Sequence, residues 1–127
     1  MGKVILDTNF ILSCVKQKID FLEDIKLMGM EILIPKQVIN ELKIISKSKK
    51  KLHFREQSEL ALKLLEKNRK SWVKKDLSNY GKNTDKGIIN FGNKNKSIII
   101  ATLDKELKNK IKNQKLVIRG KKNLEIT

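Results

Sequence analysis

Four acidic side chains occupy positions where they could bind a metal ion. Asp7 and Asp104 each follow a run of apolar, mostly β-branched residues. Glu41 falls among the apolar positions of a predicted helix, and Asp85 begins another. Carboxylate oxygens are ligands that Mg²⁺ and Mn²⁺ prefer. If these acids meet at one edge of a sheet, they could bind one or two such ions.

The two apolar runs, residues 4–6 and 97–103, predict strands buried on both faces, as in a parallel sheet. Open α/β sheets place their binding sites outside the carboxyl ends of such strands, and Asp7 lies at that end of the first one. Asp104 shares one side with Thr102 if the second strand stays extended that far. Asp104 could instead cap a helix starting at residue 105, and both interpretations stay open.

Glu41 and Asp85 are predicted to lie on helices. Pro35 is expected to open the first helix, whose apolar stripe at one-turn spacing consists of Val38, Leu42 and Ile45. Because a buried carboxylate is costly, Glu41 is either solvated at the rim of the core or held by a cation. Thr84 is expected to cap a helix beginning at Asp85, where the helix dipole also favours an acid. Ile88 and Ile89 follow three and four positions later, so the Asp85 carboxylate is expected to share the helix face that packs on the sheet.

The remaining pattern adds further strands and helices to the same unit. Short strands are predicted at residues 31–34, 72–73 and 116–118, and further helices are expected to end at Gly29 and near Asn68. Residues 119–122 are expected to form a basic turn. Because no repeat, glycine-serine linker or low-complexity tract interrupts the chain, we expect residues 1–127 to form a single domain.

The charge balance is strongly basic. Lys and Arg number 29 against 14 Asp and Glu, which gives a formal net charge of +15 and a pI near 10.0. Such an excess favours nucleic acid or another polyanion as partner. A biased genome composition is the alternative source of lysine, but it should raise Glu together with Lys. The segment from Lys43 through Arg55 has no acid and is predicted to be an exposed charged loop between helices, suited to phosphate contact.

Two features bear on the cellular compartment. The single Cys14 has no partner for an internal disulfide, which fits a reducing environment and a small buried side chain. No apolar run approaches the roughly 20 residues of a membrane span, and no secretory segment opens the chain. We therefore expect a cytoplasmic protein.

Four segments resemble the PIN-domain ribonucleases, and they occur in that family's order. They are residues 4–10, 34–42, 84–89 and 100–107. The resemblance implies an α/β fold, a three-layer sandwich with a central mainly parallel sheet flanked by helices. It also implies metal-dependent cleavage of RNA by an acidic quartet, whose catalytic and metal-binding members are Asp7, Glu41, Asp85 and Asp104. Supporting polar residues near that quartet are expected to be Thr8, Asn9 and Thr102.

The predicted function is therefore that of an endoribonuclease that uses Mg²⁺ or Mn²⁺ to hydrolyse phosphodiester bonds. The chain resembles both the branch that processes ribosomal RNA and toxins of the VapC kind, so candidate partners besides RNA are an antitoxin, ribosomal assembly factors and a second copy of the chain. Side chains expected to hold the RNA backbone are Lys49, Lys50, Lys51, Arg55, Lys105 and Lys108.

Two other functions compete with this prediction. A catalytically inactive PIN-fold module could bind RNA or the ribosome, and Lys86 favours this alternative because relatives often have a further Asp at its position. A phosphoacceptor receiver domain would also place Asp7 in an acidic cluster. Such domains usually carry paired acids after the first strand, whereas Asp7 is followed by Thr8 and Asn9, so this alternative is disfavoured.

Overall fold

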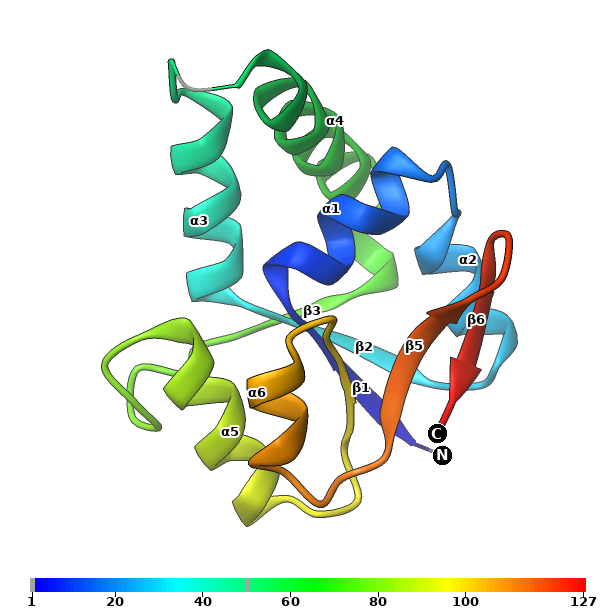
Figure 1. Ribbon diagram of the computed structural model, residues 1–127, viewed down its shortest axis with the longest axis vertical. Coiled ribbons are helices and arrows are strands. Elements are labelled where there is room, and N and C mark those ends of the chain that lie inside the picture. Colours follow the sequence, from blue (N-terminus) through cyan, green and yellow to red (C-terminus); the bar gives the residue numbers. More distant parts are fainter. Residues whose placement is uncertain (1, 50) are drawn as a thin grey trace.

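The protein is described by a computed structural model, which covers residues 2–49 and 51–127. In this part of the chain, a six-stranded sheet has the order β3-β2-β1-β4-β5-β6 (Figure 1). Its strands are β1 (Lys3–Leu6), β2 (Glu31–Pro35), β3 (Val73–Lys75), β4 (Ile99–Ala101), β5 (Lys115–Arg119) and β6 (Asn123–Ile126). β6 pairs with β5 in the antiparallel direction, and the other pairings are parallel.

Helices cover both faces of the sheet and complete three layers. The helices are α1 (Thr8–Lys16), α2 (Phe21–Leu27), α3 (Lys36–Ser46), α4 (Leu52–Lys67), a 3₁₀ turn at Arg69–Ser71, α5 (Thr84–Lys94) and α6 (Lys105–Asn109). The first four contribute to one apolar cluster, and α5 and α6 to the other (Figure 1). None of the described helices is long and apolar enough to cross a membrane.

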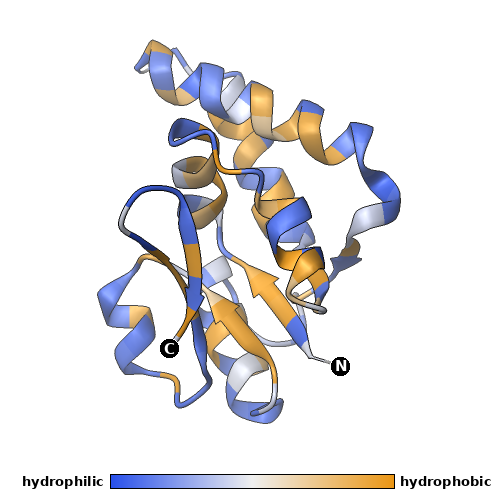
Figure 2. Ribbon diagram, turned by 90° about the vertical axis from the view of Figure 1, so that its right-hand side faces the viewer, coloured by the Kyte–Doolittle hydropathy of each residue, from blue (hydrophilic) through white to orange (hydrophobic). Residues whose placement is uncertain are grey.

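The strand β1 shows how the sequence produces this layering. Val4 and Leu6 pack in the larger apolar cluster, whereas Ile5, between them, packs in the smaller one. Successive strand residues point to opposite faces, so a sheet covered on both sides needs apolar residues at every position. Figure 2 shows strands that are hydrophobic along their length and helices in which hydrophobic and hydrophilic residues alternate. The predicted fold class, an α/β sandwich with a mainly parallel central sheet, is confirmed.

The prediction of a loop over residues 43–55 is wrong at both ends. α3 continues to Ser46 and α4 begins at Leu52, so a much shorter connection joins the two helices. Lysine is a good helix former, and like charges cost a helix only tenths of a kilocalorie per pair. Positive charge alone therefore does not prevent these turns from being helical.

The strand β6 was not predicted. The sequence analysis places a basic turn at residues 119–122, and the structure shows that the chain turns back there. Gly120 and Lys122 adopt positive φ angles of 52° and 65°, and β6 then pairs with β5. A four-residue edge strand with two apolar side chains, Leu124 and Ile126, offers too little periodicity to distinguish it from a loop.

Candidate functional site

All four predicted acids line one hollow at the carboxyl ends of β1 and β4. Asp7 follows β1, Asp104 lies beyond β4, and Glu41 and Asp85 come from α3 and α5. The hollow has a volume of about 260 Å³, and its lining residues are Asp7, Thr8, Asn9, Glu41, Asn83, Thr84, Asp85 and Asp104. The fold thus brings together acids that are spread along almost the whole chain.

Asp7 is fixed at both carboxylate oxygens. It caps α1, where the backbone N–H of Thr8 donates to Oδ1 at 2.8 Å, and the hydroxyl of Thr102 donates to Oδ2 at 3.0 Å. The side chain is buried, with 5% of its surface exposed. Burial raises the pKa of Asp7 to about 6, against the effect of its two hydrogen bonds and with a smaller contribution from the charges of Asp85 and Glu41. Burial near other carboxylates therefore makes Asp7 retain its proton to a higher pH than an exposed aspartate does.

Glu41 is held between two threonine hydroxyls. Thr8, in the first turn of α1, donates to Oε2 at 2.8 Å, and Thr84, in the first turn of α5, donates to Oε1. The side chain is half-buried on α3. The sequence leaves solvation or a cation as alternatives for this acid, and the structure shows hydroxyl donors from two other helices. Glu41 therefore links three helices around the hollow.

Asp85 lies in the first turn of α5 and is exposed at the mouth of the hollow. Partial burial raises the pKa of Asp85, and the charges of Asp104 and Glu41 raise it further, whereas Lys110 opposes the shift. The expectation that this carboxylate faces the sheet is wrong. The buried residues near the start of α5 are Thr84, Gly87 and Ile88, whereas Asp85 is exposed and lines the hollow with the other acids.

The cap of α5 differs from the prediction by one residue. Asn83 is the N-cap, and its side-chain oxygen accepts from the backbone N–H of Lys86 at 2.9 Å. Thr84 is buried in the first turn and uses its hydroxyl on Glu41 instead. Asn83 and Thr84 both line the hollow, a role that was not predicted for either residue. No local sequence pattern indicates this role, because Thr84 contacts Glu41, which lies 43 residues earlier in the chain.

Asp104 caps a helix and also lines the hollow, so the two interpretations of this residue coexist. Its Oδ1 accepts from the backbone N–H groups of Glu106 at 2.9 Å and Leu107 at 3.3 Å. The hydroxyl of Thr102 accepts from the backbone N–H of Asp104 at 3.1 Å while it donates to Asp7. Thr102 is completely buried and connects the acids that follow β1 and β4.

The donor set suits a hard divalent cation. No described basic side chain forms an ion pair with any of the four acids. Within the described residues, no three Asp, Glu, His or Cys side chains are close enough together to form a ready-made metal site. Mg²⁺ is commonly bound by one or two carboxylates and several waters, so this wider spacing is compatible with that mode of binding. The acids are therefore a cluster of negative charge that lacks a basic partner in the described part of the chain.

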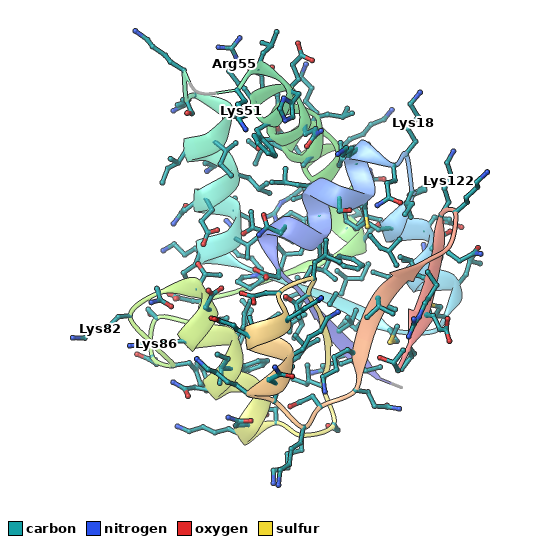
Figure 3. All side chains as sticks on the ribbon, in the orientation of Figure 1. Lys18, Lys51, Arg55, Lys82, Lys86 and Lys122 are labelled. Carbon is teal, nitrogen blue, oxygen red and sulfur yellow. The ribbon has the colours of Figure 1, made fainter. Side chains whose placement is uncertain are left out.

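None of the described residues predicted to bind RNA lines the hollow. Lys105 and Lys108 belong to α6, which begins at the hollow. Lys49, Lys51 and Arg55 lie where α3 connects to α4, and Figure 3 shows the latter two at the end of this hairpin away from the sheet. Lys50 lies outside the described residues. Among the supporting residues, Thr8 and Asn9 line the hollow, whereas Thr102 lies behind it.

The chain is similar to known proteins over almost its whole length. Residues 4–121 match the model of a family described as PIN like domain. The chain is 33% identical over 133 residues to Ribonuclease VapC4 of Methanocaldococcus jannaschii, and the match covers 99% of this chain and 97% of that protein.

Solved structures show the same architecture. The PIN domain endonuclease Utp24 superimposes with a TM-score of 0.74 at 27% identity, covering 98% of this chain and 90% of that one. VapBC2 from Rickettsia felis, solved bound to a DNA fragment from its promoter, gives a TM-score of 0.61 at 20% identity, covering 89% and 98%, and this likeness concerns the fold alone.

Proposed function

This chain belongs to the PIN-like domain family, and we propose that it is an endoribonuclease that hydrolyses RNA phosphodiester bonds with Mg²⁺ or Mn²⁺. One observation carries the proposal. Four carboxylates, contributed by the ends of β1 and β4 and by α3 and α5, line a single hollow at the sheet edge. A ribonuclease and an endonuclease among the related proteins support the same chemistry.

The residues that would hold the ion are Asp7, Glu41, Asp85 and Asp104. A divalent ion bound among them supplies Lewis-acid chemistry, since it makes water a stronger acid and stabilises negative charge on the phosphate. Both oxygens of Asp7 accept a hydrogen bond, yet each carboxylate oxygen has a second lone pair for a cation. Because burial raises the pKa of Asp7 to about 6, a cation would compete with a proton for this side chain below neutral pH.

The threonine hydroxyls position these acids. Thr8 and Thr84 hold the carboxylate of Glu41, and Thr102 holds that of Asp7. Acids fixed in this way need little reorganisation when charge develops on the substrate, and such preorganisation is the usual source of electrostatic catalysis. The reaction requires no covalent nucleophile from the chain, because water attacks the phosphorus atom.

The basic surface would bind the substrate. Lys49, Lys51, Arg55, Lys105 and Lys108 are the described residues proposed to contact phosphates, and Lys50 is proposed from the sequence alone. Such contacts increase affinity and carry no sequence information by themselves. The biological setting would be ribosomal RNA processing, with assembly factors as partners, or a toxin–antitoxin pair. A reading frame for a small acidic protein beside the gene would identify this chain as the toxin of a toxin–antitoxin pair.

Incubation of the purified protein with structured RNA and Mn²⁺ tests the proposal. We expect cleavage that EDTA abolishes and that Asp7→Asn reduces about 100-fold or more, since even residues behind a metal ligand are worth about 10- to 100-fold. Glu31→Gln is the matched control. Glu31 is exposed at the amino end of β2, and the hollow lies at the carboxyl ends of the neighbouring parallel strands.

Absence of cleavage by the wild type, or equal cleavage by Asp7→Asn, would contradict a nuclease. If RNA affinity in that case survives both chelation and Asp85→Asn, the chain is instead a binding module of the same fold. The cleavage and binding assays therefore distinguish the two functions.

A further inference from the structure

The tip of the α3–α4 hairpin, residues 47–55, combines positive charge with exposed aromatic rings. Between Glu41 and Glu56 the chain has no acid. The described cations of the tip are Lys47, Lys49, Lys51 and Arg55. Figure 3 places Lys51 and Arg55 together at the end of the hairpin. A polyanion would therefore meet no repulsive side chain from this segment.

Two aromatic rings lie on this basic surface. The rings of His53 and Phe54 have centroids 4.3 Å apart with planes tilted by 39°, and the Lys51 ammonium lies 5.9 Å from the centroid of Phe54. Phe54 is 43% exposed. The chain's other phenylalanines, Phe10, Phe21 and Phe91, are at most 5% exposed. Packing therefore accounts for three of the four phenylalanines and not for Phe54.

The core-facing side of α4 confirms that Phe54 is not needed for docking this helix. The buried residues of α4 are Ser58, Ala61 and Leu65, all in later turns. The first turn, where Phe54 lies, contributes no buried side chain. An exposed ring beside a lysine ammonium, in a basic segment, has the composition of surfaces that bind single-stranded nucleic acid, in which aromatic faces stack on bases and cations contact phosphates.

We propose that His53 and Phe54 form a stacking platform for the bases of single-stranded RNA, with Lys51 and Arg55 holding the adjoining phosphates. The choice of RNA as the ligand rests on the proposed function. The lysines of this segment favour this occupant over a protein with an apolar surface, because such a partner would have to desolvate them.

The hairpin also connects this platform to the acidic hollow. Glu41 lines the hollow, and α3 continues from it to Ser46 before the tip begins. At 1.5 Å per helical residue, the tip starts roughly 10 Å beyond Glu41. An RNA chain held at the platform can therefore reach the hollow. The platform would thus position single-stranded RNA beside the cleavage site.

Binding of a short fluorescent oligoadenylate tests the platform, with an abasic oligomer of equal length as the second probe. The measurements use Asp7→Asn protein in EDTA, so that binding is separated from cleavage. Phe54→Ala should weaken oligoadenylate binding by about five- to 150-fold, as removal of one stacked base predicts, and should leave binding of the abasic oligomer unchanged. Phe54→Leu should weaken it as much, because an aliphatic side chain cannot stack.

Leu52→Ala is the matched control, because Leu52 is 55% exposed at the same tip and is not aromatic. Phe54→Trp supplies a direct signal that does not require a disruptive substitution. Its affinity should equal or exceed that of the wild type, and oligoadenylate should quench its fluorescence. The chain's single tryptophan, Trp72, is buried with its Nε1 donating to Leu65, so the unsubstituted protein should show no quenching.

Three results would overturn the platform. The protein without a substitution at the tip could bind the oligoadenylate and abasic oligomers equally, Leu52→Ala could weaken oligoadenylate binding as much as Phe54→Ala does, or oligoadenylate could fail to quench the fluorescence of Phe54→Trp. If oligoadenylate binds at the platform as expected but the wild type cleaves no RNA, the platform is supported and the nuclease function is contradicted. If RNA cleavage does not depend on Phe54 and Phe54→Trp shows no quenching, the nuclease function is supported and the platform is contradicted.

Discussion

Asp7 is the residue whose chemistry depends most on its surroundings. Its ordinary pKa is about 3.9, and burial raises the pKa in the folded protein to about 6. Between these values the folded state retains a proton that the unfolded state has released. The stability of the metal-free protein therefore falls as pH rises through this window, by up to about 3 kcal/mol from this residue. A bound cation would remove that cost by stabilising the carboxylate.

Asp7→Asn should consequently stabilise the metal-free protein near neutral pH. We expect its unfolding free energy to exceed that of the wild type by up to about 3 kcal/mol at neutral pH, and the difference to vanish toward pH 4. Urea unfolding in EDTA across this range measures it, with Glu31→Gln as the control. A variant that is less stable than the wild type near pH 7 would contradict the assigned cause of the shift.

The positions of the four acids could be predicted because each marks the boundary or the face of a regular element. The threonine contacts could not be predicted. Thr8 and Thr84 reach Glu41 from two different helices, and Thr102 reaches Asp7 from another strand, 95 residues away. Hydrogen bonds of this kind depend on how the elements pack, which local residue patterns do not encode.

At the scale of elements, Asn113 fixes the connection between α6 and β5. Its side-chain Nδ2 lies within hydrogen-bonding distance of the carbonyl oxygens of Gly92, Asn95 and Ile98, at 2.9 to 3.0 Å. Asn113 is 2% exposed. These carbonyls belong to the end of α5 and the approach to β4, so a single amide ties together the elements that carry Asp85 and Asp104.

Asn113→Ala should lower the unfolding free energy by about 2 kcal/mol, because it removes a buried amide that donates to the carbonyl oxygens around it. Asn93→Ala is the control, since Asn93 is exposed on α5 and its replacement should change stability by less than about 0.5 kcal/mol. Thermal or urea unfolding compares the two variants. Equal stability of the two would show that the Asn113 amide does not support this connection.

Apolar elements could be predicted from the sequence better than polar ones. β1 and β4 were found because residues 4–6 and all of β4 are apolar and buried, as a strand covered on both faces requires. β6 escaped prediction because an edge strand lacks that signal. The ends of α3 and α4 were misplaced because charge was taken to indicate a loop, whereas exposed lysines suit a helix surface.

The whole molecule is a basic body with an acidic hollow at one edge of its sheet. The net charge of +15 attracts RNA over long distances, and the carboxylates of the hollow repel phosphate unless a cation lies between them. Charge and α/β class could be read from the composition and the pattern of apolar runs. The convergence of the four acids needed the three-dimensional packing as well.

Affinity for single-stranded RNA should therefore fall steeply with salt. Lys51→Gln combined with Arg55→Gln should reduce the slope of log affinity against log salt concentration by about 0.7 for each phosphate that these side chains neutralise in the wild type. The control combines Lys18→Asn with Lys122→Asn, which removes the same charge at a place apart from the hairpin tip, at the right of the view in Figure 3. Asn tolerates the positive φ angles of these two residues. An equal change of slope in both double variants would mean that net charge alone, and not the hairpin tip, governs binding.

Titration of the metal-free protein with Mn²⁺, followed by electron paramagnetic resonance of the free ion, tests the central claim most directly. We expect the wild type to bind one or two ions, more tightly at neutral pH than at pH 5 because Asp7 must lose its proton. Each of the variants Asp7→Asn, Glu41→Gln, Asp85→Asn and Asp104→Asn should weaken binding about tenfold or more, and Glu31→Gln should not. A wild type that binds no Mn²⁺, or an Asp7→Asn variant that binds it equally well, would contradict the metal site.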